Sequence, residues 1–588
     1  MLQYTLWHFL LCVECNNLGV CGPSWRRYQP KAVEAVMASS NVLFRLLTPF
    51  IFVDRTFTMS KRLAAEAFEI AGINLDSPVI KKSRTDSYPE LSNGANLPER
   101  LKAVELEDDD PDDVEQVPTV VRQNAPVEGF DDLYLDTIDR GVLDFDFEKL
   151  CSISLSNINV YACLVCGKYF QGRGPKSHAY FHSLESVHHV YINLQTQKVY
   201  VLPEGYEVTN KSLDDIKFVS DPRYSKEQVM VLDKEAKTSL ALNGKEYSPG
   251  FVGMNNIKAN DYFNVVIQAL SHVPPLRNYF LLEDLSTKSE LAKRVSILIR
   301  KIWNPRAFKS HVSPHELLQE ISLKSNKRFT LTKQSDPVDF LSWFLNNLHL
   351  ALGGSKKRPG SSIIQKIFQG TLKVESQAIT AKADAGDRLR FEEAASVQTD
   401  INRFMLLTLD LPSAPLFQDE LERNIIPQVP LTSILSKYDG RRGQEHLNQR
   451  KRYRLLLPLP PYLLFHIKRF STNKFVSERN PTIVTFDSRN LNMAPYVEPN
   501  PQIHKVGEPI WYDLVANIVH EAVMGREQGD EGRSWKVQVQ DRGKGEWKVV
   551  QDLFVEGTQK ELLYLGESYL QVWEKRREGK NVKKDGER

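Results

Sequence analysis

Residues 250–280 read GFVGMNNIKANDYFNVVIQALSHVPPLRNYF, and this stretch lies near the start of the region that decides the fold. The region runs from about residue 225 to 575. Its first part has the amphipathic pattern of helices, at 289–303 and 337–352. Strand-like alternation follows at 403–412, 462–470, 512–520 and 534–541. Helical segments followed by strands predict an α+β domain with a sizeable sheet.

The composition is that of a globular protein of two to four domains, with 588 residues, 41% hydrophobic and 26% charged. The 76 Lys and Arg residues nearly balance the 74 Asp and Glu residues, so no one-signed field indicates a nucleic-acid binder. No stretch reaches the ~20 apolar residues of a membrane helix, and no membrane partner is expected.

The six cysteines are Cys12, Cys15, Cys21, Cys151, Cys163 and Cys166. Because none follows Cys166, a disulfide framework is excluded for most of the chain, and a reducing compartment is the natural interpretation. A nucleophilic thiol is excluded from the large C-terminal region for the same reason.

Residues 1–128 are expected to be an N-terminal tail and acidic linker. Eight of the eleven residues in ELEDDDPDDVE (105–115) are acidic, and their mutual repulsion favours a disordered spacer. Residues 1–58 differ in character from the rest of the chain, and we expect them to come from an over-extended gene model. KKSR (81–84) is a weak nuclear-import candidate, and residues 576–588 are expected to form a basic tail.

A smaller module is predicted at 129–224. β-Branched and aromatic residues in 142–170, and two strand-like runs in 188–202, predict a strand-rich unit that a metal would help to stabilise. Cys163 and Cys166 form a Cys-x-x-Cys pair. Four histidines follow it: His178, His182, His188 and His189. Thiolate and imidazole ligands indicate tetrahedral zinc, although four histidines compete for two places and a redox cysteine pair is the alternative.

The segment CLVCGKYFQGRGPKSHAYFHSLESVHH (163–189) resembles the UBP-type zinc finger, a family known for gripping the free C-terminal tail of ubiquitin. The resemblance implies these zinc ligands: Cys163, Cys166, His182 and His188. Members with more zinc ions use further cysteines; here Gln171 precedes Gly172-Arg173 and only Cys151 lies upstream, so one structural zinc is expected. The family's Trp-Cys-Tyr reads Tyr200-Val201-Leu202, which implies an altered tail pocket and a structural or protein-binding role.

The stretch 250–280 resembles the cysteine box of the ubiquitin-specific proteases. Other blocks that resemble this family follow in its order, at 334–349, 368–372, 404–412, 460–470, 512–520 and 534–541. The resemblance implies a papain-like domain with thumb, palm and fingers over residues 225–575.

Proteolysis by this family needs a thiolate, a histidine that activates it and a polar group that orients the histidine. The resemblance puts Asp261 at the nucleophile position and Ser534 at the general-base position. The orienting pair reads Gln551-Asp552, the oxyanion-type Asn256 is retained, and Lys258 replaces a glycine. We therefore expect no thiol hydrolysis.

Two rescue pairs, Asp261 with His272 or with His520, find no support in the spacing. His520 lies at the end of a strand pattern and is interpreted as structural, and His466 as a residue of the core or the sheet surface.

From about residue 130 to 575 the chain resembles the tri-snRNP-associated, ubiquitin-protease-like splicing factors. This implies a nuclear, non-catalytic scaffold whose partners are tri-snRNP proteins of the spliceosome. A receptor for ubiquitin or a ubiquitin-like protein is the competing hypothesis. RNA contact is expected to be indirect or minor; residues 300–309 and 440–454 are the candidates for phosphate contact, and the second is interpreted as a solvated loop.

Overall fold

The computed structural model describes residues 133–235, 237–383, 389–413, 426–446, 448–472, 477–522 and 533–577. The expectations for residues 1–128 lie outside the described residues, as does most of the basic tail. No helix of the described part is long and apolar enough to cross a membrane.

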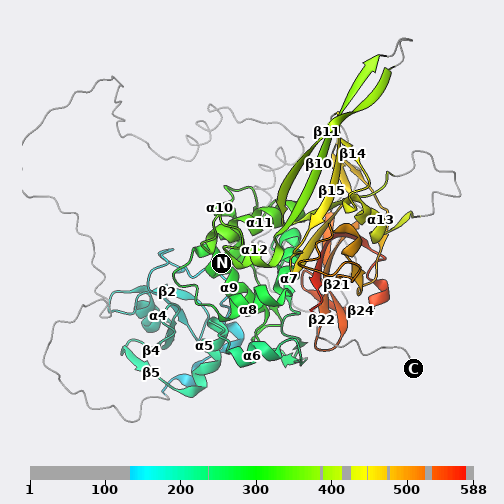
Figure 1. The fold of residues 1–588 in the computed structure, drawn as a ribbon. Helices are drawn as coiled ribbons and strands as arrows, with labels where there is room; N and C mark the ends of the chain where they lie inside the picture. The colour runs from blue at the N-terminus through cyan, green and yellow to red at the C-terminus, as the bar shows by residue number, and fades with distance from the viewer. Residues whose placement is uncertain are drawn as a thin grey trace, which may run out of the picture. The chain divides into compact units, whose positions relative to one another are not determined.

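The N-terminal module, residues 133–208, is a five-stranded antiparallel sheet in the order β2-β1-β3-β4-β5, with one helix, α4 (Figure 1). Its elements are β1 (Val160–Cys163), β2 (Tyr169–Gln171), α4 (His178–Ser186), β3 (Val190–Asn193), β4 (Val199–Val201) and β5 (Tyr206–Val208). Successive residues of β1 point to opposite faces. Val160 and Ala162 pack into one apolar cluster, and Tyr161 and Cys163 pack into another. The predicted strand-rich module is confirmed.

A layer of helices follows. Its members are α5 (Asp214–Ser220), α6 (Lys226–Val231), α7 (Asp261–Ser271), α8 (Pro274–Leu282), α9 (Glu290–Ile302), α10 (His315–Lys324), α11 (Pro337–Ala351) and α12 (Ile363–Phe368). Every residue of α7 is buried, so this helix is the centre of the layer. The helices predicted at 289–303 and 337–352 are confirmed as α9 and α11.

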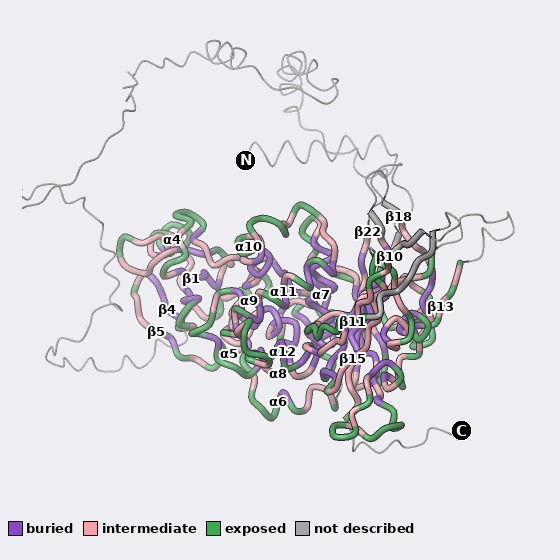
Figure 2. Tube along the Cα trace, turned by 45° about the horizontal axis from the view of Figure 1, so that its top comes forward, coloured by how far each residue is buried: buried purple, intermediate pink, exposed green. Residues whose placement is uncertain are grey.

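A large sheet of eight strands packs against these helices in the order β12-β16-β25-β21-β22-β23-β24, with β20 paired to β21. The strands are β12 (Leu407–Asp410), β16 (Tyr462–Lys468), β20 (Leu491–Asn492), β21 (Trp511–Ala522), β22 (Arg533–Asp541), β23 (Glu546–Gln551), β24 (Phe554–Thr558) and β25 (Glu567–Lys575). β16 alternates, with Tyr462 and Leu464 facing the helices and Leu463 and Phe465 facing a second cluster that includes α13 (Leu431–Leu435). Buried residues therefore line both faces of the sheet. Figure 2 shows buried residues in purple along both the helices and the strands.

A second sheet, the hairpin sheet, has the order β11-β10-β15-β14. Its strands are β10 (Gly370–Ala383), β11 (Leu389–Phe404), β14 (Gln444–His446) and β15 (Gln449–Leu456). β10 and β11 form a long hairpin that projects from the rest of the described residues (Figure 1). Four two-stranded sheets complete the fold: β6–β7 (Ser239–Leu240, Glu246–Tyr247), β8–β9 (Gly253–Met254, His311–Val312), β13–β19 (Gln428–Pro430, Ile483–Thr485) and β17–β18 (Phe470–Thr472, Ser477–Arg479).

The structure confirms the α+β class and corrects two local interpretations. The basic segment 440–454 is not a solvated loop, because most of it forms β14 and β15, and β15 pairs with β10 along its whole length. Burial of Tyr453 and Leu455 stabilises this strand despite its basic residues. The strand predicted at 403–412 is divided between the end of β11 and β12.

The N-terminal module is bonded to the helical layer through residues 143–148. The Nζ atom of Lys301, on α9, donates to the Phe145 carbonyl at 2.5 Å and to Asp146 Oδ1 at 2.8 Å. The Ser313 N–H donates to Asp146 Oδ2 at 2.9 Å. Phe308 packs into the apolar cluster of the module, so the junction is both ionic and apolar.

Candidate functional site

Four side chains of the N-terminal module converge on one point. Their potential ligand atoms all lie within 4.8 Å of one another, and the residues are Cys163, Cys166, His182 and His188. The Sγ of Cys166 lies 3.4 Å from Nε2 of His182, and the Sγ of Cys163 lies 3.6 Å from Nδ1 of His188. Zinc with bonds of ~2.3 Å to sulfur and ~2.0 Å to nitrogen would place such pairs ~3.5 Å apart. The donor set and its spacing fit zinc.

Local structure positions these ligands. Cys163 ends β1, and the following turn is closed by the Gly167 N–H, which donates to the Cys163 carbonyl at 2.9 Å. Gly167 has φ of 73°, and a Cβ there would lie 2.5 Å from the Val142 carbonyl oxygen, so glycine is required. His182 lies on α4, where its ring stacks on Phe170 at 4.2 Å.

The structure distinguishes the two histidines that belong to the cluster from the two that do not. His189 Nδ1 bonds the Leu202 carbonyl at 2.8 Å, and His178 is the first residue of α4; neither belongs to the cluster. The Cys151 Sγ accepts from the Ser154 N–H at 3.4 Å and also lies outside it. Among the described residues, the four residues of this cluster are the one group of three or more Cys, His, Asp or Glu that could hold a metal.

Asp261, at the nucleophile position of the resemblance, is the first residue of α7 and is buried. The Nε2 of Gln334 lies 2.9 Å from each carboxylate oxygen, and the Tyr262 N–H donates to Oδ1 at 2.9 Å. Burial raises the pKa of Asp261, and the charge of nearby Asp552 adds to the effect. The carboxylate is held by hydrogen bonds.

Asn256 and Asp552 are bonded directly to each other. Asn256 Nδ2 donates to Asp552 Oδ2 at 3.0 Å, and Asn264 Nδ2 donates to Oδ1 at 3.2 Å. The Met254 N–H donates to the Asp552 carbonyl at 2.7 Å, which fixes the backbone of this residue at φ of 49°. One N–H of the Asn256 side-chain amide, at the oxyanion position, therefore already donates to the Asp552 carboxylate.

Ser534, at the general-base position, belongs to a polar group on three neighbouring strands. Gln551 Nε2 donates to Ser534 Oγ at 3.0 Å and to Glu521 Oε2 at 3.4 Å, and Lys536 Nζ lies 3.0 Å from Glu521 Oε1. A hydroxyl and a primary amide do not titrate near neutral pH, so neither Ser534 nor Gln551 can serve as the general base.

Neither histidine considered as a rescue base bonds Asp261. His272 follows the last residue of the eleven-residue helix α7, ~16 Å along the axis from Asp261. Its Nδ1 bonds the Gln268 carbonyl at 2.8 Å, and burial lowers its pKa to about 4. His520 is bonded to Glu567 at 3.0 Å, and burial in the sheet lowers the pKa of His466 to about 4.

Sequence reasoning did not identify Gln334 or Asn264 as members of this site. Both residues lie within stretches that resemble the protease family: Gln334 is the first residue of 334–349, and Asn264 lies in 250–280, one helical turn after Asn260. Their bonds to Asp261 and Asp552 join segments far apart in the sequence, and only the fold shows such contacts.

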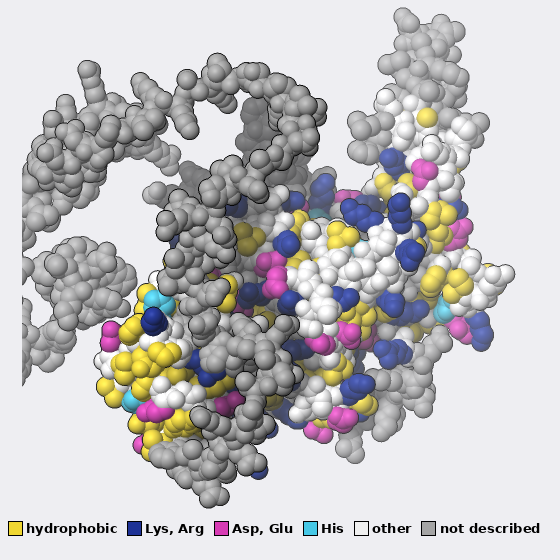
Figure 3. Space-filling view, turned by 90° about the vertical axis from the view of Figure 1, so that its left-hand side faces the viewer, with side chains coloured by type: hydrophobic (Ala, Val, Ile, Leu, Met, Phe, Trp, Pro, Cys, Tyr) yellow, Lys and Arg dark blue, Asp and Glu magenta, His cyan; other side chains and the backbone are white. Residues whose placement is uncertain are grey.

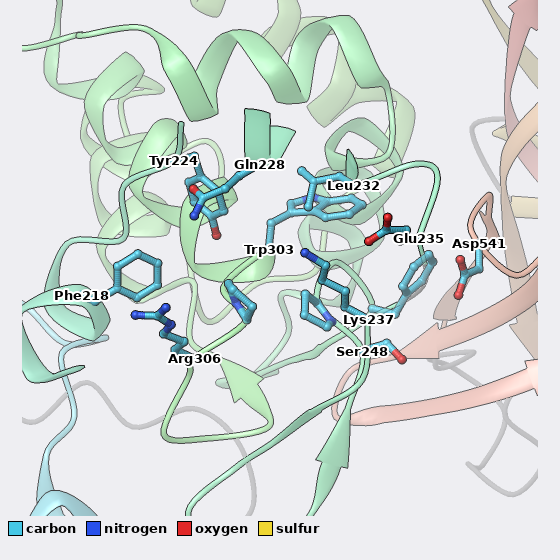
Figure 4. A pocket seen from close by; sticks show the side chains of 13 residues that line it. Phe218, Tyr224, Gln228, Leu232, Glu235, Lys237, Ser248, Trp303, Arg306 and Asp541 are labelled. Carbon is cyan, nitrogen blue, oxygen red and sulfur yellow. The ribbon is translucent and has the colours of Figure 1, made fainter. Parts of the chain in front are cut away.

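A cavity of about 330 Å³ lies elsewhere, between the helical layer and β22 (Figure 4). Tyr224, Trp303 and Arg306 line it together with Asp541 of the sheet. None of the positions that correspond to catalytic residues lines this cavity.

Two protein families match the chain, and its relatives include splicing proteins. The family described as ubiquitin carboxyl-terminal hydrolase matches residues 252–576, and the Zn-finger in ubiquitin-hydrolases and other protein matches residues 151–213. The chain is 47% identical to the probable mRNA-splicing protein ubp10 of Schizosaccharomyces pombe, over 85% of this chain and 99% of that protein. It is 50% identical to ubiquitin carboxyl-terminal hydrolase 39 of Homo sapiens, over 75% of this chain and 80% of that protein.

A solved structure agrees. The crystal structure of an essential yeast splicing factor matches with a TM-score of 0.62 and 32% identity, over 76% of this chain and 100% of that one. These matches confirm the UBP-type zinc finger and the papain-like protease domain that the sequence predicts. The chain belongs to the ubiquitin carboxyl-terminal hydrolase family, among relatives that are named as splicing proteins.

Proposed function

We propose that this protein is a non-catalytic scaffold in pre-mRNA splicing, which supports assembly or stability of the tri-snRNP through protein–protein contacts in the nucleus. The observation that carries the proposal is the similarity to a splicing protein over 99% of that protein's length. Such coverage includes the finger and the protease-like domain, so the relative and this chain share their architecture.

The altered catalytic positions support a role without hydrolysis. The nucleophile position holds a carboxylate bonded to Gln334, and the base position holds a serine bonded to Gln551. We expect no release of a fluorophore from a ubiquitin C-terminal amide at any enzyme concentration. Hydrolysis that survives removal of contaminating proteases would contradict the proposal.

We also propose one structural zinc ion, held by the four-residue cluster of the N-terminal module. Zinc would join β1, the turn after it and α4, and its binding energy would contribute to folding. The proposed domains are a tail and linker (1–128), the finger (129–224), the protease-like domain (225–575) and a basic tail (576–588).

The surface of the N-terminal module supports contacts with proteins. Hydrophobic side chains gather on the face of this module seen in Figure 3. The exposed large hydrophobic side chains of this module include six in the loop before β1 and around α4: Ile153, Leu155, Ile158, Phe181, Leu184 and Val187. Several large apolar side chains exposed on one small module mark an interaction surface.

The decisive experiment is gentle affinity purification of the native protein from nuclear extract, with identification of the proteins and small RNAs that accompany it. Tri-snRNP proteins with their small nuclear RNAs are expected. Ubiquitin conjugates without those RNAs would favour the ubiquitin-receptor alternative. Direct titration separates the two: absence of ubiquitin binding at about 1 mM removes the receptor.

A further inference from the structure

We propose that one face of the hairpin sheet binds the phosphate backbone of single-stranded RNA. Arg450, Arg452 and Arg454 lie on the same face of β15, because alternate residues of a strand point the same way. Lys373 of β10 is paired with Arg454, and the register places Arg403 of β11 on the same side. These five residues on three adjacent strands define the cationic face.

The other face of the sheet explains why the cations face outward. Leu372, Tyr453 and Leu455 point to that side and pack against or within the second apolar cluster. The cationic face is therefore the outer side at this part of the sheet. Arg403 is exposed, and the three β15 arginines are half-buried. The Nε atoms of Arg450 and Arg454 are buried, and Nη2 of Arg454 donates to the Val497 carbonyl at 3.4 Å, so the outer edge of each guanidinium is the part that can reach a phosphate.

The turn before β14 lies against the side chains of the cationic face, because a Cβ on Gly440 would lie 2.9 Å from Cδ of Arg454 and one on Gly443 would clash with Nε of Arg450. Arg441 and Arg442 are exposed, and their backbone N–H groups donate to Asp439 Oδ1 at 2.7 and 3.0 Å. The Gly440 N–H donates to the Tyr453 carbonyl at 3.0 Å, which holds this turn alongside β15. The neighbouring carboxylates are those of Glu375, Asp439, Glu445 and Glu498, so the seven cationic side chains outnumber them.

The chemistry of this face fits phosphate groups. Alternate residues of a strand are ~6.8 Å apart, a spacing comparable with that of successive phosphates along a nucleic-acid strand. Arginine presents a planar fork of donors that binds phosphate in a bidentate manner. Within residues 371–377, 397–403 and 450–456 no aromatic side chain lies on this face, so we infer contact with the backbone rather than stacking on bases.

The inference rests on the proposed splicing role only in choosing RNA over an acidic protein. The test compares the full chain with Arg450→Gln/Arg452→Gln/Arg454→Gln, titrated against a fluorescent oligouridylate of roughly 20 nucleotides. Loss of three phosphate contacts is expected to weaken binding about 100-fold at about 0.1 M salt and to reduce the salt slope by about 2. The matched control is Lys356→Gln/Lys357→Gln/Arg358→Gln, which removes the same charge from an exposed loop and is expected to change binding less than about twofold.

Equal losses of RNA affinity in the two triple variants would overturn the inference, because RNA binding would then depend only on the net charge of the protein. Polyglutamate that binds as tightly as the oligouridylate, with the same dependence on the three arginines, would overturn it in favour of an acidic protein. Photo-crosslinking of oligouridylate to the unaltered chain provides a second measurement that needs no variant; crosslinked peptides without β15 or the 439–443 turn would also overturn it. The arginine variant could still co-purify with tri-snRNP proteins and bind RNA as tightly as the unaltered chain. That result would refute RNA binding by the cationic face and leave the proposed function standing.

Discussion

At the scale of single residues, Asp261 and Asp233 are two carboxylates with opposite electrostatic surroundings. Burial raises the pKa of Asp261. Burial also disfavours the charge of Asp233, but hydrogen bonds from Arg277 at 2.7 and 2.8 Å outweigh it and lower the pKa. The pH dependence of stability should therefore differ in sign between the two.

We predict that Asp261→Asn stabilises the protein at pH 7. Below the unfolded pKa of about 3.9 both states hold the proton, and stability is lost as pH rises through the raised folded pKa. The gain from Asp261→Asn should therefore shrink as pH falls towards 4. Urea unfolding at the two pH values measures the difference, and destabilisation at pH 7 would show that the charge of Asp261 supports the fold.

Asp233→Asn is the companion variant and should destabilise by about 3 kcal/mol at pH 7, because Arg277 is 1% exposed and loses its charged partner. The stabilising effect of the native Asp233 carboxylate is present above the unfolded pKa and is lost as pH falls through the lowered folded pKa. The loss of unfolding free energy caused by Asp233→Asn should therefore diminish as pH falls, and urea unfolding at the same two pH values measures it.

At the scale of elements, the finger depends on a cluster that joins β1, α4 and the turn that follows each of them. Cys163→Ser should abolish zinc binding and unfold the N-terminal module, since structural zinc contributes on the order of 10 kcal/mol. Cys151→Ser is the matched control: Cys151 is equally buried but lies outside the cluster, so zinc should stay at one per chain. Metal analysis with hydrogen exchange over residues 133–208 provides the measurement. A folded module without zinc would remove the site.

Elements with a strong hydrophobic period were predictable from the sequence, and elements defined by long-range pairing were not. α9 and α11 end within two residues of their predicted bounds, because the apolar stripe of each helix is local. The interpretation of β15 as a solvated loop is wrong, because its four basic residues are typical of such a loop and only its pairing with β10 reveals a strand. The choice of His182 and His188 over their neighbours likewise came from the resemblance, because spacing alone left four candidates.

At the scale of the whole molecule, Lys301 joins the helical layer to the N-terminal module. Lys301→Met should destabilise by about 3 kcal/mol, because Asp146 is only 15% exposed and loses its cation. Lys293→Met, on the same helix, is the control; the Lys293 side chain is 34% exposed and pairs with Glu290 at the surface, so its loss should cost less than about 1 kcal/mol. Thermal unfolding measures both. Limited proteolysis should also release the module faster in the Lys301 variant, and equal rates would contradict a stabilising junction at this lysine.

A scaffold and an enzyme of the same fold respond differently to changes in the cleft, and this provides the last prediction. In cells depleted of the native protein, Asp261→Asn and Ser534→Ala should restore splicing fully, because no reaction passes through either side chain. Cys163→Ser should fail, since it removes the module that exposes the apolar surface around α4. Splicing of reporter introns measures the rescue, with protein levels matched between variants. If Ser534→Ala abolished rescue while the protein remained folded and bound to tri-snRNP proteins, the polar group around Ser534 would have a chemical role, and the non-catalytic scaffold would have to be abandoned.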